Sequence, residues 1–168
     1  MRVREWIPIS TSPKGRLALS AVRAFGTRPY DSVTVGELAR AADVTTGALY
    51  HHFESKLGLY AVARADVERR LLDRMEGAAA SSEDRSRAAR AALLVGFDFA
   101  VTHDFTRLLG DPAPGGGPDP VATLLAELTG GEPALGRVLA AAWRAAVTSV
   151  ADGIAAQAAR AALGSLRD

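Results

Sequence analysis

Two helix-start signals follow each other closely in the stretch SVTVGELARAADVTTGALYHHFESK. Thr34, with Glu37 three residues later, matches a capping box, and Thr45 is a second N-cap candidate. Only Asp43 and Val44 separate the apolar stripe of the first segment from this second cap, which leaves room for a tight corner alone. The spacing therefore predicts two short helices joined by a turn, the arrangement of a helix-turn-helix.

The rest of the chain also carries helical patterns. Apolar residues recur every three or four positions, and no alternation typical of strands persists. Helices are expected over 12–26, 34–42, 45–53, 55–75, 84–102 and 121–128, with a helical turn over 104–109. Breaks are expected over 77–82 and in the glycine- and proline-rich stretch 110–120, and the segment 133–166 is one helix or two with a break at Gly153.

These patterns predict an all-α protein in two parts. An N-terminal arm and three-helix helix-turn-helix domain would occupy residues 1–54, and a helical ligand-binding and dimerisation domain would occupy residues 55–168. The high hydrophobic content of 48% excludes a disordered chain, and much of it is alanine, which favours close-packed helices.

Composition also limits the kinds of site that the chain can form and its expected location in the cell. The chain has no cysteine, which excludes disulfides, thiolate zinc sites and cysteine nucleophiles and fits a reducing cytoplasm. No apolar run approaches the roughly 20 residues of a membrane span, and MRVREW at the N-terminus lacks the apolar core of a secretion signal. We therefore expect a cytoplasmic protein with no membrane contact.

The net charge of +1 is unevenly distributed. Residues 1–70 hold 11 Lys and Arg against 7 Asp and Glu, a net charge of +4, whereas residues 71–168 hold 9 against 12, a net charge of −3. A basic first part joined to an acidic second part favours a polyanion, here double-stranded DNA, as the partner of the first part.

A helix-turn-helix places its second helix in the major groove and its first helix across the DNA backbone. The side chains expected to face inward, against Leu17 and Phe25, are Leu38, Ala39, Val44, Leu49 and Phe53. The residues expected to contact DNA are Thr34, Thr45, Thr46, Gly47, Ala48, Tyr50, His51 and Lys56. Small side chains at 46–48 allow a close approach to base edges, while Lys56 and the helix start at Thr34 suit phosphates.

The first eleven residues are expected to form an arm. Arg2 and Arg4 in the arm, with Lys14 and Arg16 beyond it, are candidates for further backbone or minor-groove contacts. Three apolar side chains would pin the arm to the body of the protein: Trp6, Ile7 and Ile9.

Three other motifs contain residue types that are found in chemical sites. His51 and His52 suggest a metal, but neighbouring helix residues point about 100° apart and do not readily share one ion. His103 with Asp104 resembles an acid–base pair of a small helical enzyme, yet no nucleophile accompanies it. Gly115–Gly117 lacks the Lys-Ser/Thr of a phosphate loop. We expect no metal, no cofactor and no catalytic residue.

The segment SVTVGELARAADVTTGALYHHFESKLGLY closely resembles the DNA-binding domain of TetR-family transcriptional regulators, from Lys14 to about Val62. The resemblance implies a homodimeric repressor that a small-molecule inducer releases from a palindromic operator. The sequence departs from the family pattern at three positions. Asp43 stands where glycine is common, Thr46 where a basic residue is frequent, and Leu57 where an acidic residue is usual. At 168 residues the chain is also short for the family.

Two further sets of residues concern the second part of the chain. Candidates for lining an inducer pocket are Phe97, Phe99, His103 and Trp143, with core packing as the alternative. The stripe expected to form the dimer interface is Leu135, Leu139, Ala142, Ala146, Val150, Ile154 and Ala158, widened by Trp143 and Val147, with burial in the same subunit as the alternative. A regulator without an inducer, either constitutive or controlled by a protein partner, is the second functional hypothesis.

Overall fold

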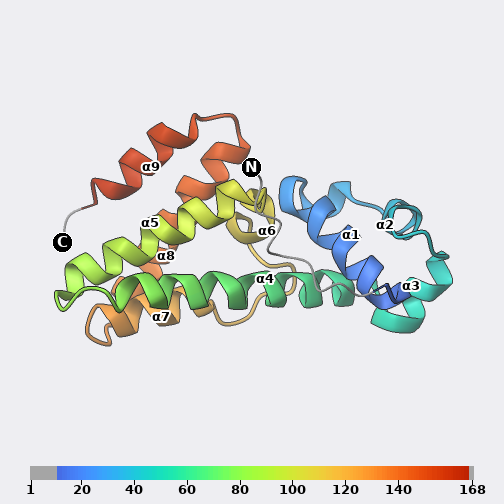
Figure 1. Ribbon diagram of the computed structural model, residues 1–168, viewed down its shortest axis with the longest axis horizontal. Helices are drawn as coiled ribbons and strands as arrows, with labels where there is room; N and C mark the ends of the chain where they lie inside the picture. The colour runs from blue at the N-terminus through green and yellow to red at the C-terminus, as the bar shows by residue number, and fades with distance from the viewer. Residues whose placement is uncertain (1–10, 167–168) are drawn as a thin grey trace.

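The computed structural model describes residues 11–166, so the expectations for Arg2, Arg4, Trp6, Ile7 and Ile9 lie outside the described residues. Every regular element within this range is helical, which confirms the all-α prediction (Figure 1). The elements are α1 (Pro13–Thr27), the 3-10 helix η1 (Tyr30–Ser32), α2 (Val35–Ala41), α3 (Thr46–Phe53), α4 (Lys56–Ala79), α5 (Arg85–Thr102), α6 (Thr106–Gly110), α7 (Pro120–Leu128), α8 (Pro133–Ala151) and α9 (Ala156–Gly164).

Helix α4 connects the two parts of the molecule. Helices α1, α2 and α3 gather at one end, and α4 runs from them along the bundle formed by the remaining helices (Figure 1). Along its length α4 packs first on α1 and α3 and then on α5 and α7, while α9 lies against α5 and α8. The expected division between residues 54 and 55 falls at the N-cap of α4 and stays a prediction.

Side-chain caps explain where the helices begin. In the capping box of α2, the Thr34 hydroxyl accepts from the Glu37 amide at 3.2 Å and the Glu37 carboxylate accepts from the Thr34 amide at 2.8 Å. Because the first amides of a helix lack intrahelical acceptors, each cap sets a start position. The other side chains that cap helices are Ser12, Thr45, Ser55, Asp84, Asp119 and Glu132.

The end of α4 differs from the expectation, and the last segment is divided into two helices. The break expected over 77–82 is wrong at its start, because α4 continues to Ala79. The Ala79 side chain is buried in the core, and this burial stabilises the last turn of the helix. The last segment is two helices, interrupted after Ala151 where Gly153 has φ +99°. Over residues 11–166, no helix combines the length and apolar character needed to cross a membrane.

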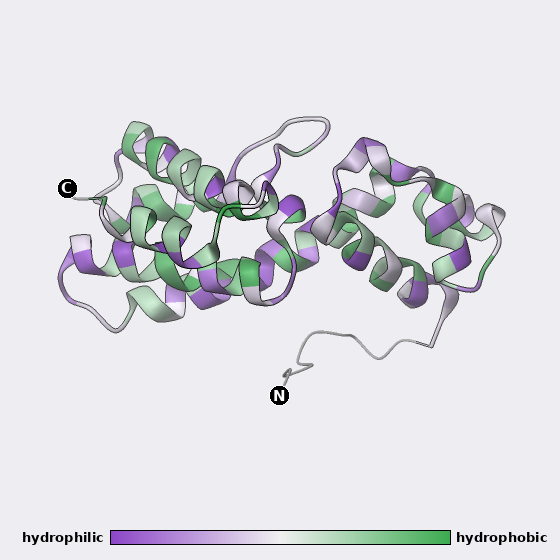
Figure 2. Ribbon diagram, turned by 90° about the horizontal axis from the view of Figure 1, so that it is seen from above, coloured by the Kyte–Doolittle hydropathy of each residue, from purple (hydrophilic) through white to green (hydrophobic). Residues whose placement is uncertain are grey.

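Apolar residues, green on the ribbon of Figure 2, occur in the helices of both parts of the molecule, and many of them are buried in the core. The largest fully buried residues include Trp143, Phe25 and Phe97. A single cluster of buried residues runs from α1 through α4 to α8 and α9, so both parts share one continuous core.

Two arginines fasten the loop that joins α6 to α7. Arg144 of α8 donates to both carboxylate oxygens of Asp119, at 3.0 and 2.6 Å, and also to the carbonyl of Leu109. Arg64 of α4 donates to the carbonyl of Asp111 at 2.9 Å. The loop is therefore held at both ends, although its middle is rich in glycine and proline.

Asp119 also caps α7, accepting from the amides of Val121 and Ala122. Its half-buried position opposes ionisation, but the hydrogen bonds and charge of Arg144 outweigh burial and lower the pKa of the carboxyl. A lowered pKa in the folded state means that the ion pair stabilises the fold above the ordinary Asp pKa. This contribution is lost as the pH falls through the lowered value.

We predict that Asp119→Asn lowers the free energy of unfolding at pH 7 by about 1–2 kcal/mol, because asparagine keeps the cap but removes the charge that pairs with Arg144. The deficit should shrink as the pH falls below about 5. Urea unfolding at several pH values measures both effects. The matched control is Asp98→Asn, which removes an exposed pair with Arg160 and should change little. A deficit that is independent of pH would contradict the assignment.

Candidate nucleic-acid interface

Arg16 of α1 holds the turn between α2 and α3. Its guanidinium donates to the carbonyl of Ala42 at 2.8 Å, to that of Asp43 at 3.3 Å and to that of Thr11 at 2.7 Å. The turn needs such support because Asp43 has φ +52°, in the left-handed region that few residues other than glycine adopt. Arg16 is thus a structural residue of the turn, which differs from the DNA contact expected for it.

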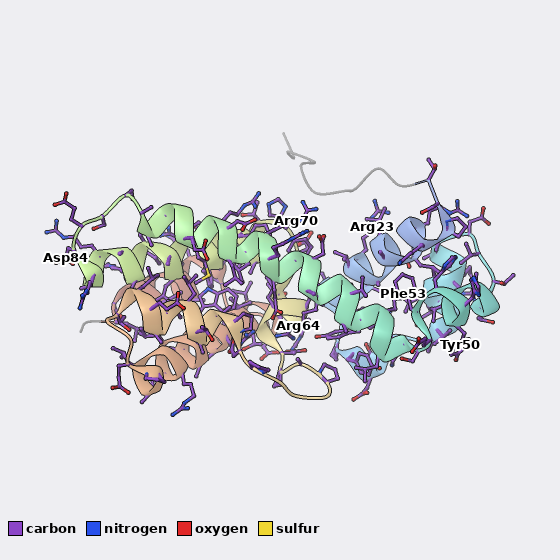
Figure 3. The ribbon with its side chains drawn as sticks, turned by 90° about the horizontal axis from the view of Figure 1, so that it is seen from below. Arg23, Tyr50, Phe53, Arg64, Arg70 and Asp84 are labelled. Atoms are coloured by element: carbon purple, nitrogen blue, oxygen red, sulfur yellow. The ribbon has the colours of Figure 1, made fainter. Side chains whose placement is uncertain are left out.

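Helix α3 is oriented by its two buried side chains. Leu49 and Phe53 point into the core of the three-helix unit, and Lys14 lies 5.9 Å from the centre of the Phe53 ring. The opposite side of α3 consequently faces solvent. Figure 3 shows Tyr50 at the outer end of the molecule and Phe53 on the inner side of the same helix.

Most residues predicted to contact DNA belong to α3 or its N-cap. Thr45, Thr46, Gly47, Tyr50 and His51 are exposed and Ala48 is half-buried, while Thr34, at the start of α2, is also exposed. The hydroxyl of Thr45 accepts from the amide of Ala48 at 3.2 Å, so it caps the helix as well as lying on the surface. The structure therefore places most of these side chains on α3 and its N-cap, and their contact with DNA stays a prediction.

The joint between α3 and α4 is unusually close. An added Cβ at Gly58 would lie 2.2 Å from the carbonyl oxygen of Phe53, so only glycine fits there. Glu54, which ends α3, has φ +64°, and the Ser55 hydroxyl accepts from the Gly58 amide at 2.9 Å to start α4. These features set the angle at which α3 leaves the long helix.

Lys56 faces the protein as well as the surface. Its ammonium donates to the carbonyls of Tyr30 and Val33, both at 3.0 Å, and lies 4.0 Å from the centre of the Tyr30 ring. An ammonium carries three N–H donors, and these two carbonyls take two of them. The sequence predicted a phosphate contact for Lys56, and this second role in fastening α4 to η1 was missed.

The histidines form no metal site in the described part of the chain. No group of three or more His, Cys, Asp or Glu side chains suited to a metal occurs over residues 11–166. The rings of His51 and His52 have centroids 5.1 Å apart. The His103 ring packs in an aromatic cluster at the end of α5, with its centroid 5.0 Å from that of Phe99 and 5.7 Å from that of Phe105.

The residues predicted to line a pocket are mostly core residues. Phe97, Phe99 and Trp143 are each less than 5% exposed. One feature stands out among them: the indole N–H of Trp143 is buried and has no hydrogen-bond acceptor among residues 11–166. A cleft of about 520 Å³ lies nearby, between α4 and the loop after α6, and its lining includes Tyr60, Arg64 and Arg144.

The predicted dimerisation stripe is divided between the core and the surface. Leu135, Ile154 and Ala158 are exposed, whereas Leu139, Ala142, Ala146 and Val150 are half-buried. The expected widening of the stripe by Trp143 and Val147 is wrong, because both are fully buried within the same subunit. The exposed side of α8 is instead centred on Val138, which is 63% exposed.

Comparison with known proteins identifies the three-helix unit. The family model described as "Bacterial regulatory proteins, tetR family" matches residues 19–63, which run from α1 into α4. The segment from α1 into α4 is therefore similar to the DNA-binding part of this family. This match favours a DNA-binding regulator over the small enzyme suggested by His103 and Asp104.

Two curated relatives cover the same region. The HTH-type transcriptional activator FasR of Mycolicibacterium smegmatis is 36% identical over 92 residues, which are 54% of this chain and 41% of that protein. The HTH-type transcriptional repressor Rv1474c of Mycobacterium tuberculosis is 44% identical over 50 residues, 29% of this chain and 27% of that protein. The chain thus spans less than half the length of either curated relative.

A solved structure shares the fold beyond the DNA-binding unit. A TetR-family transcriptional regulator from Pectobacterium atrosepticum aligns with a TM-score of 0.65 over 90% of this chain and 88% of that one, at 22% sequence identity. At this identity the likeness shows the fold alone. The helical bundle of this chain therefore has the same architecture as that protein.

We predict opposite effects for two replacements of Asp43. Asp43→Gly should raise the free energy of unfolding by about 0.5 kcal/mol, because glycine adopts φ +52° without strain. Asp43→Val should lower it by about 1–2 kcal/mol, because a β-branched residue is strained there. Urea unfolding of the parent and the two variants measures the order of their free energies of unfolding. Equal stability of the glycine and valine variants would show that the turn carries no strain.

Proposed function

We propose that this chain is a homodimeric transcriptional regulator that binds a palindromic operator through α3. The observation that carries the proposal is the exposed face of α3, where Thr46, Gly47 and Tyr50 project from a helix whose other side is locked in the core. The major groove admits one such helix, and small residues at its N-terminal end allow close approach to base edges.

Contacts with phosphates would flank the groove. Thr34 is exposed at the N-terminus of α2, and the exposed cations Lys14 and Arg40 lie on α1 and α2, which both pack against α3. Phosphate contacts position a protein on the duplex, and base contacts give it sequence preference. Thr46 supplies no charge at the start of α3, so we expect α3 to contribute more to sequence preference than to non-specific affinity.

Pairing of two copies through α8 and α9 would present two recognition helices to one duplex. This part of the proposal is supported by apolar side chains that the fold leaves on the surface of these helices, namely Leu135, Val138, Ile154, Ala158 and Ala161. A two-fold dimer reads two half-sites of a palindrome about one DNA turn, or a multiple of it, apart.

Control by a small-molecule inducer is the finer part of the proposal. It is supported by the buried, unpaired N–H of Trp143, because an unsatisfied buried donor is costly unless something accepts from it. A change in the bundle could also reach the DNA-binding helices through a direct contact with α1. An added Cβ at Gly26 of α1 would lie 2.3 Å from the carbonyl oxygen of Asp104, so α1 sits directly on the turn between α5 and α6. A shift of that turn would move α1.

The alternative regulator, without an inducer, is favoured by a different observation. Phe97 and Trp143 are almost completely buried, and the described clefts are lined by other residues. The two versions differ in whether any small molecule lowers operator affinity. The names of the curated relatives, one an activator and one a repressor, support neither sign of regulation over the other.

The test is selection of bound duplexes from a random DNA pool at about 0.15 M salt, a fixed ionic strength because phosphate contacts depend steeply on salt. We expect enrichment of one palindrome. We expect Tyr50→Ala to weaken binding to it by about 1–2 kcal/mol, roughly tenfold. Tyr50→Phe is the matched variant that keeps the ring and reports on the hydroxyl alone.

A folded dimer that enriches no sequence would contradict the proposal. Circular dichroism and sedimentation of each variant provide the control for folding and assembly. Lys56→Ala needs this control most, because its loss also removes two hydrogen bonds that hold α4 to η1.

A further inference from the structure

An apolar groove of about 220 Å³ lies between α1 and α4. It is lined by Gly15, Ala18, Leu19, Val22, Val62, Ala63 and Asp66. Six of these seven residues are glycine or apolar, and Val62 is 48% exposed. Covering such surface gains free energy in proportion to the apolar area removed from water.

The polar end of the groove is an acceptor. The Asp66 carboxylate pairs with Arg69 and, at 3.2 Å, with Arg70, both on α4. Figure 3 shows where Arg70 lies on this helix and where Arg23 lies on α1. A carboxylate has about four acceptor positions, so Asp66 has capacity for a further N–H donor from whatever fills the groove.

The N-terminal arm carries side chains that match this lining. Residues 1–10 read MRVREWIPIS and contain one tryptophan and two isoleucines close together. The same segment supplies donors for Asp66, namely the indole N–H of Trp6 and the guanidinium groups of Arg2 and Arg4. The helix-turn-helix contacts described above use none of the apolar residues of the arm.

The arm begins at a fixed point beside the groove. The guanidinium of Arg16 donates to the carbonyl of Thr11 at 2.7 Å. Thr11 is four residues before Gly15, which lines the edge of the groove. The five residues from Thr11 back to Trp6 span about 16 Å when extended. The groove extends about 10 Å along α1, from Gly15 to Val22. An arm that folds back along α1 therefore brings Trp6 within reach of Val62.

We propose that Trp6 of the protein's own arm docks in the groove between α1 and α4. A docked indole covers about 150–250 Å² of surface, and its N–H is directed to Asp66. The docked ring clamps the first helix of the DNA-binding unit to the helix that leads into the bundle.

Fluorescence of Trp6 tests this proposal without DNA, so its outcome is independent of the proposed function. The chain has two tryptophans, and Trp143→Phe leaves Trp6 as the single emitter. We expect a blue-shifted emission and acrylamide quenching several-fold weaker than that of free tryptophan. Because Trp143 is fully buried, its replacement risks the fold. The difference spectrum between the natural protein and Trp6→Phe gives the same information with Trp143 in place.

Matched variants locate the docking site. Val62→Lys places a charge in the groove and should raise the quenching of Trp6 to the value of free tryptophan. Leu57→Lys changes another exposed apolar residue of α4, outside the groove, and should leave it unchanged. The proposal is overturned if Trp6 is as accessible as free tryptophan in the parent. It is also overturned if Val62→Lys leaves Trp6 shielded, or if the shielding depends on protein concentration, which would assign the groove to another copy.

Discussion

The structure depends on one long helix, α4, which has a buried apolar face along its whole length. The residues of α4 that face the core are Leu59, Tyr60, Ala63, Val67, Leu71, Met75 and Ala79, all less than 7% exposed. They recur every three or four positions through the helix, so α4 cannot rotate about its axis without exposing apolar surface on α1 and α5 at once. The orientation of α3 relative to the bundle therefore follows from the packing of a single element, which Figure 1 shows running through both parts.

Polar groups complete this packing where apolar contacts end. Burial alone would lower the pKa of Arg64, but its contacts with Glu68 and Tyr60 outweigh burial and raise it, so the guanidinium stays charged inside the protein. Arg64 then has a donor for the loop at Asp111, and Arg144 holds the other end of the loop through Asp119. Lys56 and Arg16 act similarly on the carbonyls around η1 and the α2–α3 turn. Removing the partner of a buried charge lowers the free energy of unfolding. We therefore expect the fold to be sensitive to substitutions that break these contacts.

Local signals predicted the helix starts well, and tertiary contacts were harder to predict. Thr34, Thr45 and Ser55 cap helices as expected, because a cap depends on residues three positions away. Arg16 and Lys56 were expected to reach phosphates, since the sequence shows a basic residue but not the carbonyls that distant segments bring to it. Trp143 was placed on the dimer stripe for the same reason, because periodicity finds the apolar faces of a helix without telling which of them the same subunit covers.

The central claim is that two copies of α3 occupy successive major grooves of one duplex. Hydroxyl-radical footprinting on a duplex recovered by selection tests it most directly, because it maps protected sugars on both strands. The account predicts two protected patches related by two-fold symmetry, with centres about 10–10.5 base pairs apart or a multiple of that spacing. A single unsymmetrical patch, or uniform weak protection along the duplex, would contradict it.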